Sequence, residues 1–276
     1  MASSLLVAAA LAATGAPDNA CPPQPAIPPA ISKWRESVYA PGNRKMIPPP
    51  ITEATAYRNA YLEARKTDWA DLCKYHDDNL KLLALPPAER AVVFMGDSIT
   101  EAWNYGDPKF FAGGWIDRGI SGQTTSQMLL RFPSDVLALK PRVVHIMAGT
   151  NDIAGNTGPM ALDGIEANIK AMVTLAKAGG IRVVIAAVPP AGKFAWQPKA
   201  QPAPLIAALN ARLRALAARE GATFVDYGTM LAMPDGAMKD EYSLDGVHPN
   251  AAGYAAIEPL ARKAVGAALA KNAGKR

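Results

Sequence analysis

Three short apolar runs constrain the fold of this chain more than any other feature of its sequence. They span residues 91–95 (AVVFM), 143–148 (VVHIMA) and 183–188 (VVIAAV), and glycine or proline follows each of them. Continuous apolar runs of this length are typical of strands that are buried on both faces, as in a parallel sheet. Weaker strand candidates lie at 115–117 and 223–226.

Helical patterns alternate with these runs. Apolar residues recur at the helical period over 124–139, 163–178, 204–219 and 251–270. Strands that alternate with helices of this length indicate βαβ units. We therefore predict a three-layer α/β/α sandwich with a mostly parallel central sheet. It forms one domain over 89–270, followed by a basic tail over 271–276.

The first twenty residues suggest export. Residues 5–13 form an apolar run of nine residues, far short of the roughly 20 that span a bilayer. Such a run suits a signal peptide, although no basic residue precedes it, and an alanine-rich disordered start is the alternative. Asp18-Asn19-Ala20 before Cys21 lacks the leucine of a lipobox, which argues against a lipid anchor. We predict an exported protein, periplasmic or secreted.

Residues 21–88 form a predicted extension to the domain. The proline-rich stretch 22–50 has no apolar periodicity and predicts an extended arm or linker. From 52 to 83 the pattern is helical, with a break at Thr67-Asp68. Tyr57, Tyr61 and Trp69 contribute to an apolar stripe, which needs a partner surface. We expect these helices to pack on the outside of the sandwich, without lining a catalytic pocket; a homodimer contact is the alternative.

The composition excludes several classes of protein. Two cysteines and three histidines provide no ligand cluster for zinc, and no P-loop or GxGxxG occurs, so we expect neither metal nor cofactor. The net charge is +5, but no basic stripe with aromatic residues marks a nucleic-acid binder. We expect no nucleic-acid partner and no stable membrane insertion. Cys21 and Cys73 either form a disulfide in an exported protein, or Cys73 is free and buried.

Three polar segments follow predicted strands, at the strand ends where open α/β sheets bind ligands, and a fourth precedes the last predicted helix. They are 96–100 (GDSIT), 119–124 (GISGQT), 149–152 (GTND) and 245–250 (DGVHPN), the last of which opens the final helix. A serine hydroxyl is a weak nucleophile without an adjacent base. The spacing of Asp245 and His248 lets one turn carry both a base and the carboxylate that orients it. The segment 96–100 lacks the second glycine of G-x-S-x-G, which argues against an α/β-hydrolase.

These four segments, in this order, resemble the signature blocks of the GDSL, or SGNH, hydrolase superfamily over residues 91–255. The resemblance implies a flavodoxin-like sandwich and a serine esterase that forms an acyl-enzyme on Ser98. It implies that His248 is the base and that Asp245 orients it. The oxyanion hole implied by the resemblance consists of the Ser98 and Gly122 N–H groups and the Asn151 amide, with Gly119 as an alternative to Gly122.

The loops set the substrate, and the motifs do not identify it. In the long loop 189–204, Phe194 and Trp196 are candidates to contact substrate, or else they pack the loop. Trp103 is a further candidate because it follows the nucleophile closely in the chain. We expect a monomer or weak homodimer that cleaves short-chain acyl or acetyl esters of a small molecule, carbohydrate or lipid. The alternatives are an acyltransferase to a sugar or lipid hydroxyl, a lysophospholipase or thioesterase, and a non-catalytic carbohydrate-binding module.

Overall fold

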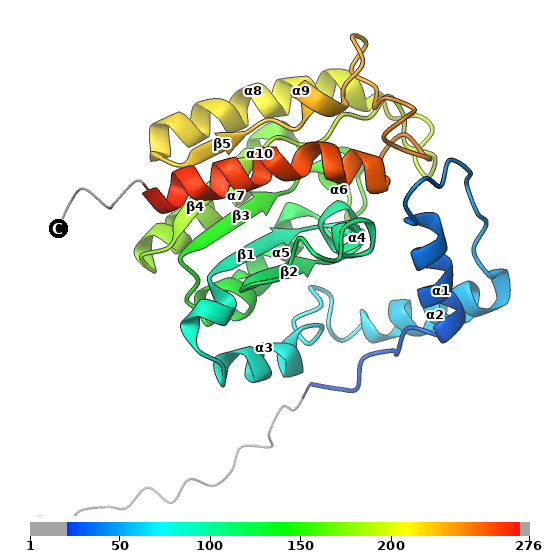
Figure 1. Cartoon of the computed structure of the whole chain (residues 1–276), viewed down its shortest axis with the longest axis horizontal. Helices are drawn as coiled ribbons and strands as arrows, with labels where there is room; N and C mark the ends of the chain where they lie inside the picture. The colour runs from blue at the N-terminus through cyan, green and yellow to red at the C-terminus, as the bar shows by residue number, and fades with distance from the viewer. Residues whose placement is uncertain (1–20, 271–276) are drawn as a thin grey trace, which may run out of the picture.

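A single parallel sheet forms the centre of the molecule, and the computed structural model describes residues 21–270 around it. The predicted signal peptide and the basic tail lie outside the described residues. The strand order is β2-β1-β3-β4-β5, and all neighbouring pairs are parallel (Figure 1). The strands are β1 (Val92–Gly96), β2 (Trp115–Gly119), β3 (Val143–Met147), β4 (Arg182–Ala186) and β5 (Thr223–Val225).

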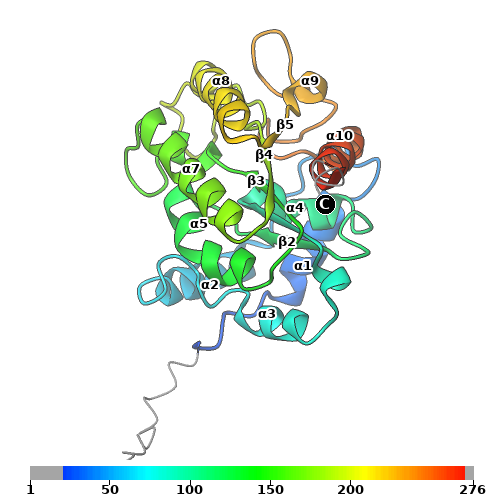
Figure 2. The same cartoon turned by 90° about the vertical axis from the view of Figure 1, so that its left-hand side faces the viewer.

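Helices cover both faces of this sheet, as Figure 2 shows from its edge. One layer contains α5 (Thr125–Phe132), α7 (Leu162–Ala178) and α8 (Pro202–Glu220), and the opposite layer contains α4 (Ser98–Gly106) and α10 (Ala251–Ala270). The short helices are α6 (Thr150–Ile153) and α9 (Gly228–Leu231), with a 3-10 turn at Pro87–Arg90 and a π turn at Pro133–Leu137. The predicted three-layer sandwich is confirmed.

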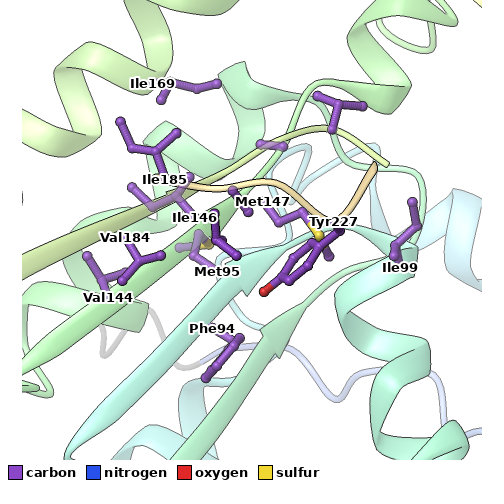
Figure 3. Packing of buried hydrophobic residues seen from close by; sticks show 14 of the residues in the cluster. Phe94, Met95, Ile99, Val144, Ile146, Met147, Ile169, Val184, Ile185 and Tyr227 are labelled. Carbon is purple, nitrogen blue, oxygen red and sulfur yellow. The ribbon is translucent and has the colours of Figure 1, made fainter. Parts of the chain in front are cut away.

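The core lies where the apolar strands meet the two helical layers (Figure 3). Every residue of β1 and β3 is buried, which explains why these strands are continuous apolar runs instead of alternating ones. His145 is the one polar side chain of β3, and it is fully buried, with Nε2 2.9 Å from the Tyr227 hydroxyl. Burial lowers the pKa of His145 to about 3. This histidine is therefore neutral and part of the core.

The N-terminal extension differs from the prediction in one element. The proline-rich stretch contains a helix, α1 (Pro29–Val38), where we predicted an extended arm. Proline at the first helical position is favourable, because its fixed φ suits the helix and its missing N–H needs no partner. Ile31, Trp34 and Val38 then recur at helical spacing. The extension continues with α2 (Ile51–Ala64) and α3 (His76–Leu83), and the predicted break falls between them.

A disulfide braces the extension internally, and polar contacts tie it to the domain. Cys21 and Cys73 form a disulfide, which decides between the two alternatives for these cysteines. The carbonyl oxygens of Trp69 and Ala70 accept hydrogen bonds from Gln127 and Gln123, at 2.7 and 2.9 Å. These contacts place the segment before α3 against the loop that carries the second motif.

Candidate active site

The carboxyl end of β1 places the half-buried Ser98 at one end of the sheet. Asp97 caps α4 by accepting the Ile99 N–H at 2.9 Å, and Ser98 is the first residue of the helix. Gly96 permits this tight turn from strand to helix, since a Cβ there would collide with the Thr100 side chain. The Ser98 hydroxyl is therefore presented beyond the carboxyl end of the strand, where α/β folds bind ligands.

A braced turn before α10 brings the histidine to this serine. The two atoms that meet are Ser98 Oγ and His248 Nε2, 2.9 Å apart. On the other side of the ring, His248 Nδ1 lies 2.6 Å from Asp245 Oδ2. Asp245 Oδ1 also accepts the backbone N–H of His248 at 2.8 Å, and Ser243 donates to the His248 carbonyl oxygen at 2.8 Å. The turn thus fixes the ring orientation.

This geometry specifies how the imidazole can act. A carboxylate at Nδ1 favours the tautomer with its proton on Nδ1, and Nε2 is then free to accept the Ser98 proton. Burial works to lower the pKa of His248, but the hydrogen bond and charge of Asp245, with the charge of Asp97, outweigh it and raise this pKa. Burial likewise opposes ionisation of Asp245, yet its bonds to His248 and Val247 hold its pKa far below the usual range.

Two loops beside Ser98 carry the other predicted site residues. Gly122 has a φ of +79°, a conformation that favours glycine. The N–H groups of Gly122 and Ser98 make no hydrogen bond to other described residues. Asn151 is buried, and its Nδ2 lies 3.0 Å from the Gln123 carbonyl oxygen and 3.2 Å from Asp97 Oδ2. The Asn151 amide is therefore held by the protein on the same side as Gly122.

Asn156 links these two loops, and our sequence reasoning missed it. Its Nδ2 donates to Asn151 Oδ1 at 2.8 Å and to the Gly122 carbonyl oxygen at 3.1 Å. These bonds orient the Asn151 amide so that its nitrogen faces Asp97 and Gln123. Asn156 lies four residues after the third motif, and no spacing in the sequence points to it.

The aromatic candidates for substrate contact differ in how far their side chains are exposed. Trp103 and Phe194 are wrong predictions, because their side chains are 0% and 1% exposed and belong to the core. Trp103 stacks on Phe110, with ring centroids 4.2 Å apart. Trp196 is 46% exposed, and its Nε1 lies 3.2 Å from Asn156 Oδ1. Of these three aromatic residues, Trp196 alone has a surface that a ligand can reach.

A pocket of about 260 Å³ opens beside Ser98, and the N-terminal extension forms one of its walls. Ser98, Asp245, His248 and Leu244 line one side, and Glu101 and Tyr105 of α4 line another. The wall from the extension consists of Trp34, Arg35, Val38, Tyr39 and Met46, and the lining is completed by Ala102, Ser121 and Asn250. The helices α2 and α3, which we expected to stay out of the pocket, do not line it, and its wall comes instead from the stretch that we predicted as an extended arm. The missed signal is the amphipathic spacing within α1, which the surrounding prolines obscured.

Within residues 21–270, no group of three or more His, Cys, Asp or Glu side chains is arranged to hold a metal ion. In the same part of the chain, none of the helices combines the length and apolar character that crossing a membrane requires.

Comparison with known proteins gives the family. Residues 94–256 match the model of the GDSL-like lipase/acylhydrolase family. A crystal structure of a protein from Bacteroides fragilis assigned as an acylhydrolase is 45% identical, with a TM-score of 0.70, over 73% of this chain and 98% of that one. A GDSL-like lipase from Bacteroides thetaiotaomicron is 43% identical, with a TM-score of 0.69, over 72% and 98% of the two chains.

A curated relative from Bacillus subtilis, the uncharacterised lipoprotein YqeF, is 42% identical over 80 residues. The match covers 23% of this chain and 32% of the relative, so the chain spans about a third of that relative's length. The family match includes the ends of β1 and β3 and the turn before α10, which are the segments that meet at Ser98. The chain belongs to the GDSL-like lipase/acylhydrolase family.

Proposed function

We propose that the protein is a serine ester hydrolase that cleaves short acyl esters through an acyl-enzyme on Ser98. The observation that carries the proposal is the chain of contacts from Ser98 Oγ to His248 Nε2 and from His248 Nδ1 to Asp245 Oδ2, at 2.9 and 2.6 Å. A nucleophile, a base and an orienting carboxylate in this geometry are what acyl transfer requires. Hydrolysis of p-nitrophenyl esters from acetate to palmitate tests the activity and its acyl range.

The proposed reaction has two steps with balanced proton transfers. His248 Nε2 takes the Ser98 proton while Oγ forms a bond to the ester carbonyl carbon. The resulting tetrahedral intermediate collapses, its bond to the alcohol oxygen breaks, and the same proton passes from Nε2 to the leaving alcohol. Water then attacks the acyl-enzyme with His248 again as the base, which releases the acid and restores Ser98.

Three donors are proposed to stabilise the negatively charged oxygen of the intermediate. They are the Ser98 and Gly122 N–H groups, which have no partner among the described residues, and Nδ2 of Asn151. Preorganised donors of this kind act because they need no rearrangement as charge develops. The Asn151 amide already contacts Asp97 and Gln123, so it would share one N–H with the oxyanion.

Replacing Asn151 with alanine is expected to lower kcat by about 10²–10³, the usual loss for one oxyanion donor. Steady-state kinetics on p-nitrophenyl acetate measures the effect. Asn168→Ala is a suitable control, because Asn168 bonds to Thr125 and Ser126 on α5 and does not line the pocket. An unchanged kcat in Asn151→Ala would remove Asn151 from the oxyanion hole.

The raised pKa of His248 sets the expected pH dependence. Only neutral imidazole accepts the Ser98 proton, so kcat/KM is expected to fall as the pH decreases through the His248 pKa, above the ordinary 6.5. Asp97→Asn removes one of the charges that raise this pKa, and the acid limb is expected to move to lower pH. Asparagine retains the helix cap at this position. If the acid limb of kcat/KM in Asp97→Asn has the same midpoint pH as in the wild type, the Asp97 charge does not act on His248.

The preference for short acyl chains is proposed from the surroundings of the oxyanion donors. The Trp196 indole bonds to Asn156, which in turn bonds to Asn151. A large ring therefore lies close to the region that an acyl chain would enter beyond the carbonyl carbon. We also propose that the protein is exported, because disulfides such as Cys21–Cys73 persist in oxidising compartments, and because the Bacillus subtilis relative is a lipoprotein.

A further inference from the structure

The wall formed by the N-terminal extension has no role in the reaction described above. It lies outside residues 94–256, which match the family model. We infer that this wall, with α4, forms the subsite for the alcohol part of the ester, and that it selects neutral, ring-shaped alcohols that carry hydroxyl groups. The inference rests on the proposed function and adds a binding site and a substrate class to it.

The position of the pocket relative to His248 assigns it to the alcohol. Ser98, His248 and Asp245 line the pocket, as does Ser121 beside Gly122, whereas Gly122 and Asn151 themselves do not. In the tetrahedral intermediate the oxyanion must face its donors, while the leaving oxygen must lie within reach of His248 Nε2 to receive a proton. The groups attached to the leaving oxygen then occupy the space on the histidine side of Ser98, which is this pocket.

The wall is braced within the extension and packed against α4. The disulfide between Cys21 and Cys73 joins the start of the extension to the segment before α3, and Ile31 of α1 is buried. Tyr39 stacks on Tyr105 of α4, with ring centroids 6.2 Å apart. Within the wall, Trp34 Nε1 donates to the Ile47 carbonyl oxygen at 2.7 Å, which joins α1 to the segment that follows it. A wall held in this way is preorganised, and binding a ligand against it costs little conformational entropy.

Arg35 connects the wall to α4 and to the loop of the second motif. Its Nη1 donates to the Tyr105 hydroxyl at 2.9 Å and lies 4.0 Å from Glu101 Oε1. Glu101 Oε2 in turn accepts the Ser121 N–H at 2.9 Å, next to Gly122. The wall therefore contacts the same network that holds the loop of the proposed oxyanion donor.

The side chains that line the pocket favour a ligand that is a neutral ring with both apolar and polar surface. Trp34, Tyr39 and Tyr105 supply aromatic surface, and Val38 adds an aliphatic contact. The charge of Arg35 is balanced by Glu101, so the pocket offers no unpaired cation for a phosphate or carboxylate group. Aromatic side chains with polar edges suit a ligand with an apolar face and hydroxyl groups at its rim. Cyclic sugars have this form.

Val38 offers the sharpest test, because its apolar side chain lines the pocket, while the hydrogen bond from Asn43 goes to its backbone carbonyl oxygen and does not depend on the side chain. Val38→Phe narrows the subsite and Val38→Ala widens it. Lys33→Ala, at an exposed position of the same helix, is the matched control. The substrates are methyl acetate, an acetylated methyl xyloside, and p-nitrophenyl acetate and butyrate, and the melting temperature of each variant confirms folding.

For Val38→Phe we expect kcat/KM on the acetylated xyloside to fall about tenfold, the scale of a misfit in a pocket. The kcat/KM of Val38→Phe on methyl acetate should stay close to the wild-type value. In Lys33→Ala, kcat/KM should stay close to the wild-type value on both the xyloside and methyl acetate. Val38→Ala is expected to reduce the preference of the enzyme for the xyloside over methyl acetate. The ratio of kcat/KM in the variant to kcat/KM in the wild type should be the same for p-nitrophenyl acetate and p-nitrophenyl butyrate, because the two esters share one alcohol.

Two results would overturn the inference. If Val38→Phe loses the same factor of kcat/KM on the xyloside and on methyl acetate, the wall does not contact the alcohol. A loss that grows from acetate to butyrate would place the wall on the acyl side. Ser98→Ala, assayed in parallel, separates these failures from that of the proposed function, since residual hydrolysis in Ser98→Ala would contradict the mechanism whatever Val38 does.

Discussion

Ser98→Ala is expected to lower kcat for ester hydrolysis by about 10⁶, which leaves only residual activity. The variant removes the atom that attacks the ester while its neighbours stay in place. Ser98 Oγ makes one side-chain hydrogen bond, to His248 Nε2 at 2.9 Å, and alanine is a good helix former at the start of α4. The melting temperature should therefore stay near that of the wild type.

A serine-reactive fluorophosphonate gives a second measurement of the same residue. We expect the wild type to be labelled at Ser98 and the Ser98→Ala variant to be unlabelled. Ser134→Ala is the matched control, because Ser134 lies on the π turn after α5 and its hydroxyl bonds only to Arg131 and Asp135. Labelling or turnover that survives in Ser98→Ala would contradict Ser98 as the nucleophile.

Asp245→Asn is expected to lower kcat by about 10⁴, as when a triad carboxylate is replaced by an amide. The asparagine amide can donate to Nδ1, and the imidazole then carries its proton on Nε2, where it cannot accept the Ser98 proton. The variant also removes the charge that raises the pKa of His248, so the acid limb of the remaining activity should move to lower pH.

The comparison with Asp240→Asn controls for the loss of an acidic residue from the same segment, since Asp240 is exposed and does not line the pocket. Asp245 Oδ1 accepts the backbone N–H groups of Val247 and His248, and an asparagine oxygen can accept both. The turn should therefore keep its shape. Activity within a few fold of the wild type in Asp245→Asn would mean that the carboxylate does not set the tautomer.

The fold could be predicted from local patterns because its central strands are buried on both faces. β1, β3 and β4 were visible as apolar runs, and α7 and α10 as periodic segments close to their observed ends. The helix α1 was not predicted, since proline usually signals an extended chain. Pro29 instead occupies the first position of the helix, where proline is compatible with helical structure.

The reacting groups were also open to prediction, because each follows a strand or precedes a helix within one short motif. Ser98, His248 and Asp245 meet because the carboxyl ends of parallel strands lie on one edge of the sheet. The residues that contact the substrate could not be predicted in this way. Trp103 and Phe194 are aromatic residues near the motifs in sequence, but their rings fill the core. Proximity along a helix or loop does not say which way a side chain points.

By itself, the sequence determined the sheet, the motifs at its edge and the residue types that acyl transfer needs, because these follow from short-range periodicity and spacing. The tertiary structure alone decided which surfaces enclose Ser98. Val38 of α1 and His248 before α10 are 210 residues apart yet line one pocket. Their meeting depends on the Arg35–Tyr105 bond and the packing of α1 on α4. Such contacts join distant segments, and no local pattern in a single sequence records them.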